Sequence, residues 1–176
     1  MRGAKRAEIL LGIFLAGCLG FPPCIWAAEP KGYQGQRSPQ VDIPVTIEKA
    51  NVVFNMDHLA FAGDMPVGIK YMGLLVQRFK EMKTKGRIIG IFHGDAAYMT
   101  LNDQSYNSFR NVKTGNPYKE VIADLINQGV QIEECAFSMK SHNWGNEDLL
   151  PRVKVNTGAV GRLIQLTQEG YVQIQP

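Results

Sequence analysis

The stretch Ile88-Ile89-Gly90-Ile91-Phe92, which His93-Gly94 follows at once, decides the fold of this chain. Five apolar residues in a row, rich in β-branched side chains, predict a strand that is covered on both faces, as in a parallel sheet. The residues before it, 67–83, carry apolar side chains at helical spacing and end shortly before Gly86, which is typical of a helix stop. A helix that leads into a buried strand is half of a βαβ unit.

The same alternation of helix and strand runs through the rest of the chain. Four more short apolar runs predict strands, at residues 52–54, 130–137, 153–155 and 171–174. Two further segments with helical spacing predict helices, at residues 118–127 and 159–168. The polar residues 102–116 are interpreted as turns and loop. We therefore expect an α/β domain with a parallel sheet of about five strands and helices on both faces.

The first 28 residues differ from the rest and predict an export signal peptide, because a basic start leads into a short apolar run. Two processing routes remain open. Residues 15–18, Leu-Ala-Gly-Cys, resemble a lipobox, in which Cys18 would be lipidated and would hold the protein to the membrane. Ala28 instead ends an ordinary signal-peptidase site, and we favour this route to a soluble periplasmic protein. Residues 29–44 predict a flexible tether, and residues 45–176 the domain.

The composition excludes several classes of function. Without the leader, 148 residues remain, enough for one domain with a core, and the net charge falls from +3 to about +1. No basic stripe with interleaved aromatic residues is present, so nucleic acid is not an expected partner. The motifs GxGxxG, GxxxxGK[ST] and GxSxG are absent, so neither nucleotide binding nor a serine hydrolase is indicated, and we expect no cofactor.

Chemically active side chains follow the predicted strands, at the carboxyl edge where open parallel sheets bind ligands. Cys135 ends the third strand and becomes the single thiol if the leader, with Cys18 and Cys24, is removed. Such a cysteine is either a buried apolar residue or a thiol kept for reaction. His93 is the candidate proton acceptor beside it. The candidate binding residues are His58, Asp57, Lys140 and Asn156.

Activation of Cys135 has a plausible route in the sequence that follows it. A short helix over residues 138–142, with Ser138 as its N-cap and Lys140 near the thiol, would favour the thiolate. Metal binding is an alternative, because cysteine and histidine together suit zinc or copper, although no ligand spacing typical of such sites is present. The metal ligands would be His58, His93, Cys135 and Asp57.

Three short motifs together resemble the DsrE/DsrF-like family. They are His93-Gly94 after the second strand, Asn116-Pro117-Tyr118 at a helix start, and Cys135 after the third strand. The C-terminal third, with Arg162-Leu163-Ile164 and Gln168-Glu169-Gly170-Tyr171, is similar to exported members. The resemblance covers about residues 52–176. It implies a three-layer α/β/α domain, frequent assembly into homo-oligomers, and sulfur carried as a persulfide on a cysteine where Cys135 stands.

Two functions from different classes follow from this reading. The first is an exported sulfur carrier that receives sulfur from a donor protein or small sulfur compound on Cys135 and passes it to an acceptor. The second is a small-ligand or metal-binding domain, or an oligomeric scaffold, with no covalent step. The sequence leaves open whether the protein turns over as an enzyme.

Overall fold

The computed structural model describes residues 38–176, and the helices and strands that it describes lie within the unit Ile43–Pro176. The predicted leader, with Cys18 and Cys24, lies outside the described residues, as do residues 29–37 of the predicted tether. Residues 38–44 are exposed and contain no helix or strand. Within the described part of the chain, no helix combines the length and the apolar character needed to cross a membrane.

Five parallel strands form the central sheet, in the order β6-β5-β4-β1-β7. Their bounds are β1 Val52–Met56, β4 Ile88–Phe92, β5 Gln131–Cys135, β6 Lys154–Asn156 and β7 Val172–Ile174. The predicted α/β class is confirmed, and each predicted strand corresponds to one of these. The sequence did not predict the short antiparallel hairpin of β2 (Phe61–Ala62) and β3 (Met65–Pro66).

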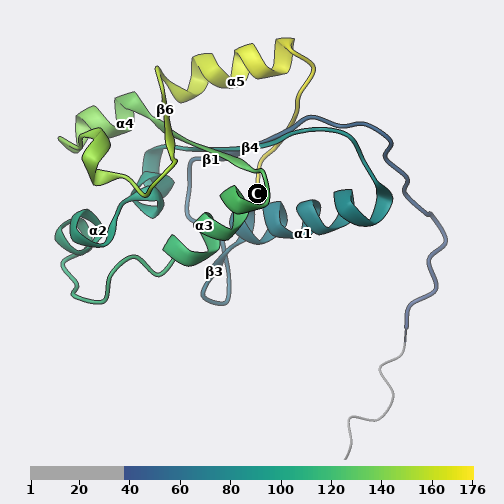
Figure 1. Ribbon diagram of the computed structural model, residues 1–176, viewed down its shortest axis with the longest axis horizontal. Coiled ribbons are helices and arrows are strands. Elements are labelled where there is room, and N and C mark those ends of the chain that lie inside the picture. The colour runs from purple at the N-terminus through teal and green to yellow at the C-terminus, as the bar shows by residue number, and fades with distance from the viewer. Residues whose placement is uncertain (1–37) are drawn as a thin grey trace, which may run out of the picture. The chain divides into compact units, whose positions relative to one another are not determined.

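Helices cover both faces of the sheet (Figure 1). The helices α1 (Val67–Met82) and α3 (Lys119–Asn127) lie on one face, and α5 (Ala159–Gln168) lies on the other. All three were predicted from apolar spacing. In α1 this spacing buries Ile69, Met72 and Val76 against the sheet, and the helix ends where Lys83 adopts a left-handed conformation.

The two faces of the strands supply two separate cores. Phe54 and Phe92 belong to the large core beneath α1 and α3. Val53 and Ile91, one residue away in each strand, belong to a smaller core beneath α5. Cys135 belongs to the smaller core. Because side chains alternate along a strand, the Cys135 side chain lies on the α5 face of the sheet.

A helix lies in the region that the sequence predicted to be loop. The helix α2 (Asp103–Arg110) occupies half of the polar stretch 102–116, so that prediction was wrong. The Asn102 side chain caps α2 by accepting a hydrogen bond from the Ser105 backbone N–H at 2.9 Å. Tyr106 is the one buried residue of α2, and Phe109 is its one other large apolar residue, so two such side chains among eight were too few to indicate a helix.

Two short helices directly follow the carboxyl ends of strands β4 and β5, and a third lies between the second of these and β6. They are the 3₁₀ helix η1 (Gly94–Thr100), the helix α4 (Ala136–Ser141) and the 3₁₀ helix η2 (Asn146–Asp148). The helix α4 starts immediately after β5, so the prediction that Ser138 is its N-cap was wrong. The residue in the N-cap position is Cys135 itself.

Candidate functional site

Four of the residues singled out in the sequence form one row across the carboxyl edge of the sheet. Met56 pairs with Phe92, Phe92 pairs with Glu134, and Cys135 pairs with Asn156. Continuing this register by one residue places Asp57 beside His93 and His93 beside Cys135. The row therefore reads Asp57, His93, Cys135, Asn156. These residues lie along the carboxyl edge of the sheet, where the sequence predicted them.

Cys135 lies where two helices begin. The helix α4 starts at the next residue, and α5 starts at Ala159, whose backbone N–H donates to the Cys135 Sγ at 3.3 Å. The N-terminus of a helix carries unpaired N–H groups and a partial positive charge. Both features favour a negative charge on the sulfur.

The same donors change the acidity of the thiol. Burial by itself raises the pKa of Cys135, because the side chain is 4% exposed. Backbone N–H groups of Ser138, Ala159 and Phe137 outweigh this effect, with help from the Ser138 hydroxyl, so the pKa lies below its ordinary value. Lowered thiol pKa values at helix N-termini are typical of reactive cysteines.

A pocket of about 520 Å³ leads to the buried sulfur, and we call it the Cys135 pocket. The turns around His93 and Gly94, the helix α4 and the first residues of α5 form its wall. Its lining residues are His93, Gly94, Cys135, Phe137, Ser138, Ser141, Gly158, Ala159, Val160 and Gly161. The thiol is thus buried among apolar neighbours and still borders a space that accepts a small reagent.

His93 occupies the wall of this pocket with one ring nitrogen engaged. Its Nε2 lies 2.7 Å from the Asn55 Oδ1. Burial lowers the pKa of His93, and the charge of Asp57 opposes this effect in part. The following Gly94 has φ +54, and a Cβ there would lie 2.8 Å from the Asp57 carbonyl oxygen. Glycine therefore permits the sharp turn that places the imidazole at the strand end.

Asp57 and His58 lie at the outer end of the row. The Asp57 carboxylate contacts the His58 Nδ1 and accepts a hydrogen bond from the Gln175 Nε2 at 2.7 Å. Burial works against the charged form, but these hydrogen bonds outweigh it and lower the pKa of Asp57. Gln175 and Asn55 were not identified from the sequence, because the pairing of β1 with β7 that joins them cannot be read from residues 120 positions apart.

Two neighbouring glutamates on β5 hold the strand end from opposite faces. On the α5 face, the Glu133 carboxylate accepts hydrogen bonds from the Arg162 guanidinium at 2.9 and 3.0 Å. On the other face, Glu134 is fully buried, and burial raises its pKa well above the ordinary value. Its Oε1 accepts the Cys135 backbone N–H at 3.0 Å. Neither glutamate was singled out from the sequence.

Two predicted binding residues, Lys140 and Asn156, do not line the Cys135 pocket. Lys140 is exposed, and its Nζ lies 5.7 Å from the centre of the Phe137 ring rather than in the lining of the Cys135 pocket. The groups that lower the Cys135 pKa are hydrogen-bond donors of the main chain and Ser138. Asn156 donates from Nδ2 to Glu133 at 3.2 Å, and its Oδ1 is buried without a hydrogen-bond partner.

The metal alternative receives no support from the geometry of residues 38–176. Among these residues, no group of three or more His, Cys, Asp or Glu side chains is placed to hold a metal ion. Asp57 and His58 are close together, but His93 is turned to Asn55 and Cys135 to the helix N-termini.

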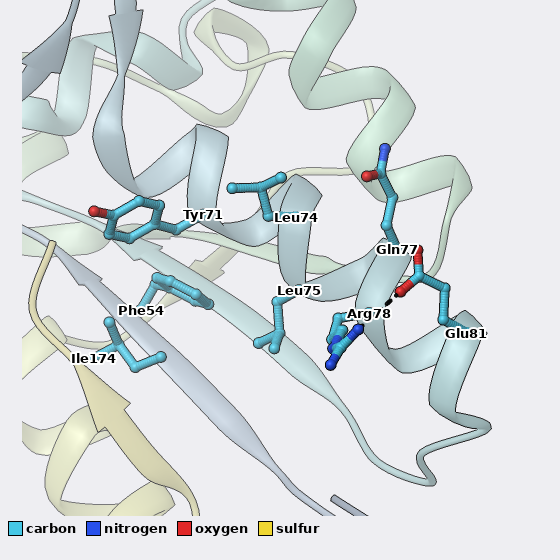
Figure 2. Close-up of a pocket in the computed structure, with 8 residues that line it drawn as sticks. All are labelled: Phe54, Tyr71, Leu74, Leu75, Gln77, Arg78, Glu81 and Ile174. Atoms are coloured by element: carbon cyan, nitrogen blue, oxygen red, sulfur yellow. Dashed lines mark hydrogen bonds and ion pairs between the residues drawn. The ribbon is translucent and has the colours of Figure 1, made fainter. Parts of the chain in front are cut away.

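A second hollow lies beside α1, on the opposite face of the sheet, and we call it the α1 groove. Figure 2 shows Phe54 and Ile174 from the strands facing Tyr71 and Leu75 of α1 across it. Its volume is about 470 Å³. Its charged residues, Arg78 and Glu81, pair with each other at 3.2 Å. It contains no nucleophile or unpaired acid.

Comparisons with known proteins show a family through a sequence model and a fold through solved structures. The family model described as "DsrE/DsrF-like family" matches residues 69–176. A protein of unknown function, MTH1491 from Methanobacterium thermoautotrophicum, is 21% identical with a TM-score of 0.53, over 72% of this chain and 99% of that one. The ychN protein from E. coli is 15% identical with a TM-score of 0.51 over the same shares. No curated protein matches the chain.

Proposed function

The chain belongs to the DsrE/DsrF-like family, and on this basis we propose that it is an exported sulfur carrier that holds sulfur as a persulfide on Cys135. One observation carries the proposal. The Cys135 Sγ lies at the start of two helices, accepts the Ala159 N–H at 3.3 Å and borders a pocket of about 520 Å³. A stabilised thiolate with access for a small reagent is the chemical requirement for sulfur transfer.

The transfer is a displacement at sulfur. The Cys135 thiolate attacks the outer sulfur of a donor persulfide, R–S–S⁻. A new S–S bond forms to Cys135, the S–S bond of the donor breaks, and R–S⁻ leaves with the electron pair of that bond. The products are Cys135–S–S⁻ and the donor thiolate, so no external oxidant is consumed. Passing the sulfur on repeats the same step with an acceptor thiolate as the nucleophile.

In this proposal His93 accepts the thiol proton, and the helix N-termini stabilise the negative charge on sulfur. His93 is neutral because burial lowers its pKa, so it can take the thiol proton when Cys135 ionises. The N–H groups of Phe137, Ser138 and Ala159 that stabilise the thiolate also favour the negative charge of the persulfide. Asp57 and His58 lie at the outer end of the row and are the proposed binding residues for the donor.

The proposal includes a compartment and partners. Export rests on the sequence of residues 1–28, and the periplasm is where a donor and an acceptor, either proteins or small sulfur compounds, would meet the carrier. Self-association is also proposed. Tyr71 and Leu74 of α1 are 46% and 52% exposed beside the apolar α1 groove, and such surfaces favour burial against a second copy.

Mass spectrometry of the sulfur-treated protein tests the transfer. Trypsin releases residues 120–140 as one peptide with Cys135 as its single cysteine, so the modification is assigned even if Cys18 or Cys24 is present. After incubation with inorganic polysulfide and alkylation of thiols, this peptide is expected to gain the mass of one sulfur atom. The gain is expected to disappear on reduction.

The control is Cys135→Ser, which keeps a small polar side chain at the same site and should show no gain. A wild-type peptide that alkylates readily but never gains sulfur would exclude the carrier and leave the ligand-binding alternative. A wild-type thiol that resists alkylation altogether would exclude any reactive role for Cys135.

A further inference from the structure

We infer that Asp57, Gln175 and Asn55 form a hydrogen-bond relay of fixed direction that holds the proton of His93 on Nε2 and leaves Nδ1 as its proton acceptor. The four residues come from β7 and the ends of β1 and β4, on the face that also carries Cys135. The inference rests on the proposed function where it gives His93 a task, and it makes Asn55 and Gln175 positioning residues.

The direction of the relay starts at Asp57. An ionised carboxylate can accept hydrogen bonds but cannot donate them. The Gln175 side chain must therefore turn its Nε2 to the Asp57 Oδ1, at 2.7 Å. This leaves the Gln175 Oε1 as an acceptor for the next residue. The neighbouring His58 does not change this choice. Its Nδ1 contacts the Asp57 Oδ1 and lies 3.2 Å from the Gln175 Nε2, so the carboxylate oxygen is the shared acceptor of the two nitrogens.

The direction then passes through two amides to the imidazole. The Asn55 Nδ2 donates to the Gln175 Oε1 at 2.6 Å, because that oxygen has no proton to offer. The Asn55 Oδ1 consequently faces His93, and the His93 Nε2 lies 2.7 Å away. An oxygen acceptor at that distance requires a proton on Nε2. In a neutral imidazole the lone pair then resides on Nδ1.

Burial prevents the relay from reversing in the native protein. Asn55 is 8% exposed, so water cannot replace the partners of its amide. Rotating that amide would turn its Oδ1 toward the Gln175 Oε1 and the Asp57 carboxylate, to which the Nδ2 donates at 2.6 and 3.5 Å. Oxygen would then face oxygen at both positions, and the buried Asn55 amide would lose both acceptors.

The relay gives Asp57 an influence on His93 without direct contact. When His93 Nδ1 takes the Cys135 proton, the imidazolium keeps its Nε2–H bond to Asn55, and the negative charge of Asp57 at the end of the relay favours the cation. The charged and titratable groups around His93 are Asp57 and His58 from the end of β1 and Cys135 from β5. Burial and Asp57 act on the His93 pKa in opposite directions.

Two substitutions at the exposed Gln175 test the direction of the hydrogen-bond relay, because one should keep the His93 proton on Nε2 and the other should move it to Nδ1. Gln175→Glu keeps an acceptor for the Asn55 Nδ2, so the proton of His93 should stay on Nε2. Gln175→Lys presents a donor to both Asp57 and Asn55. The Asn55 amide should then rotate, donate to His93 Nε2 and move the proton to Nδ1. Gln173→Lys adds the same charge on the same strand at another exposed glutamine and should leave His93 unchanged.

Long-range ¹H–¹⁵N NMR of the imidazole nitrogens reads the tautomer directly. His93 is assigned with His93→Gln, and His58 and His142 serve as internal references. The wild type and Gln175→Glu are expected to show the Nε2–H form, and Gln175→Lys the Nδ1–H form. A wild-type His93 protonated on Nδ1, or a Gln175→Lys spectrum identical to wild type, would overturn the relay.

Sulfur loading of Cys135, measured on the same samples, separates this inference from the carrier proposal. Gln175→Lys should slow loading about a hundredfold, the low end of what a general base contributes. If the tautomer responds as expected but the wild type takes up no sulfur, the relay stands and the carrier fails. If the wild type loads normally and the tautomer ignores both substitutions, the carrier stands and the relay fails.

Discussion

The Cys135 pocket and the α1 groove have similar volumes, about 520 and 470 Å³, yet differ in what their walls offer a ligand. The pocket gathers the first N–H groups of two helices, a thiol and an imidazole. The groove presents apolar side chains and one Arg–Glu pair closed on itself (Figure 2). The two hollows are therefore not distinguished by their size or by their apolar lining. Convergent main-chain donors distinguish them.

The topology explains the difference. The Cys135 pocket lies at the carboxyl edge of the sheet, where helices begin, so their unpaired N–H groups meet there. The α1 groove lies along the side of the sheet, between the middle of α1 and the edge strand β7, where helix N–H groups are already paired within the helix. A side groove therefore supports apolar contact, and the carboxyl edge supports anionic chemistry.

The largest expected effect contrasts the two Arg–Glu pairs. Arg162 and Glu133, beside the pocket, have side chains 22% and 3% exposed, whereas Arg78 and Glu81, in the groove, are 55% and 65% exposed. Arg162→Met leaves the buried Glu133 carboxylate without its charge partner, with only the amides of Gln131 and Asn156 as donors, and should lower the free energy of unfolding by about 3 kcal/mol. Arg78→Met should cost less than about 0.5 kcal/mol. Urea unfolding monitored by circular dichroism measures both.

A double variant provides the control for this contrast. Replacing Glu133 and Arg162 together by leucine removes both charges and should recover most of the lost stability, since apolar residues often replace a buried ion pair without loss. An equal loss of stability in Arg162→Met and Arg78→Met would show that the burial of the Arg162–Glu133 pair does not increase its contribution to stability.

Glu134, which is buried on the other face of the sheet from the Cys135 pocket, should make the free energy of unfolding depend on pH. Burial raises the pKa of Glu134 in the folded protein, so the fold favours the protonated carboxyl group. The stability that this group contributes is fully present below pH 4.5, its ordinary pKa, and is lost as the pH rises through the raised pKa. Glu134→Gln can still accept the Cys135 N–H and donate to Thr100. Relative to wild type, it should gain roughly 1 kcal/mol per pH unit above the ordinary carboxyl value.

Urea unfolding of wild type and Glu134→Gln at several values between pH 5 and 8 measures this gain. Glu120→Gln, at an exposed position on α3, is the control and should run parallel to wild type. A Glu134→Gln curve that also runs parallel to wild type would mean that Glu134 is charged in the folded protein.

Ala159→Pro removes a single donor from the sulfur. Ala159 is the first residue of α5, where proline is tolerated because the N–H is not needed by the helix. The pKa of Cys135 should rise, and its alkylation by iodoacetamide at neutral pH should slow at least about tenfold, because hydrogen bonds to charged groups contribute about 1.5–3 kcal/mol. Peptide mass spectrometry against pH gives the rates.

Gly161→Ala, in the same helix turn and with open space around its Cβ, is the matched control and should keep the wild-type rate. An unchanged rate in Ala159→Pro would show that the second helix does not support the thiolate, and the pocket would then resemble the groove in having no special donors.

The smallest effect on Cys135 is expected from the groove. Leu74→Asp places a charge on its exposed rim and should disperse a self-associated species while changing stability by no more than about 0.5 kcal/mol. Sulfur loading should stay at the wild-type rate. Light scattering after gel filtration reports the association, with Val112→Asp as a control at another partly exposed apolar residue. Reduced loading in Leu74→Asp would mean that groove and pocket act together.

Much of the fold follows from apolar periodicity, and part of the site follows from topology. The runs around Ile88–Phe92 and the spacing in residues 67–83 mark a buried strand and its helix because each must bury a face. The rule for carboxyl edges then brings His93 and Cys135 together. The helix α2 was not predicted because it buries Tyr106 alone and its other residues are mostly polar.

The parts of the site that sequence reasoning missed share a physical cause. Asn55 and Gln175 meet through the register of β1 with β7, which depends on strand order. The donor at Ala159 is a main-chain group, so its side chain carries no sign of it. Lys140 was chosen for closeness in sequence, but the helix turns it over Phe137. The catalytic and binding roles of the chosen residues stay predictions.

The support of the sulfur by peptide groups has an evolutionary consequence. Every amino acid except proline supplies the same amide, so substitutions at residues 137 and 159 can accumulate without removing these donors, whereas a change at Ser138 would also remove its hydroxyl. The lasting demand is that residue 159 is not proline, while the demand for glycine at 158 holds as long as Phe137 is present, because a Cβ there would lie 2.9 Å from its ring. Related sequences could therefore diverge widely and still keep the same main-chain donors at this sulfur.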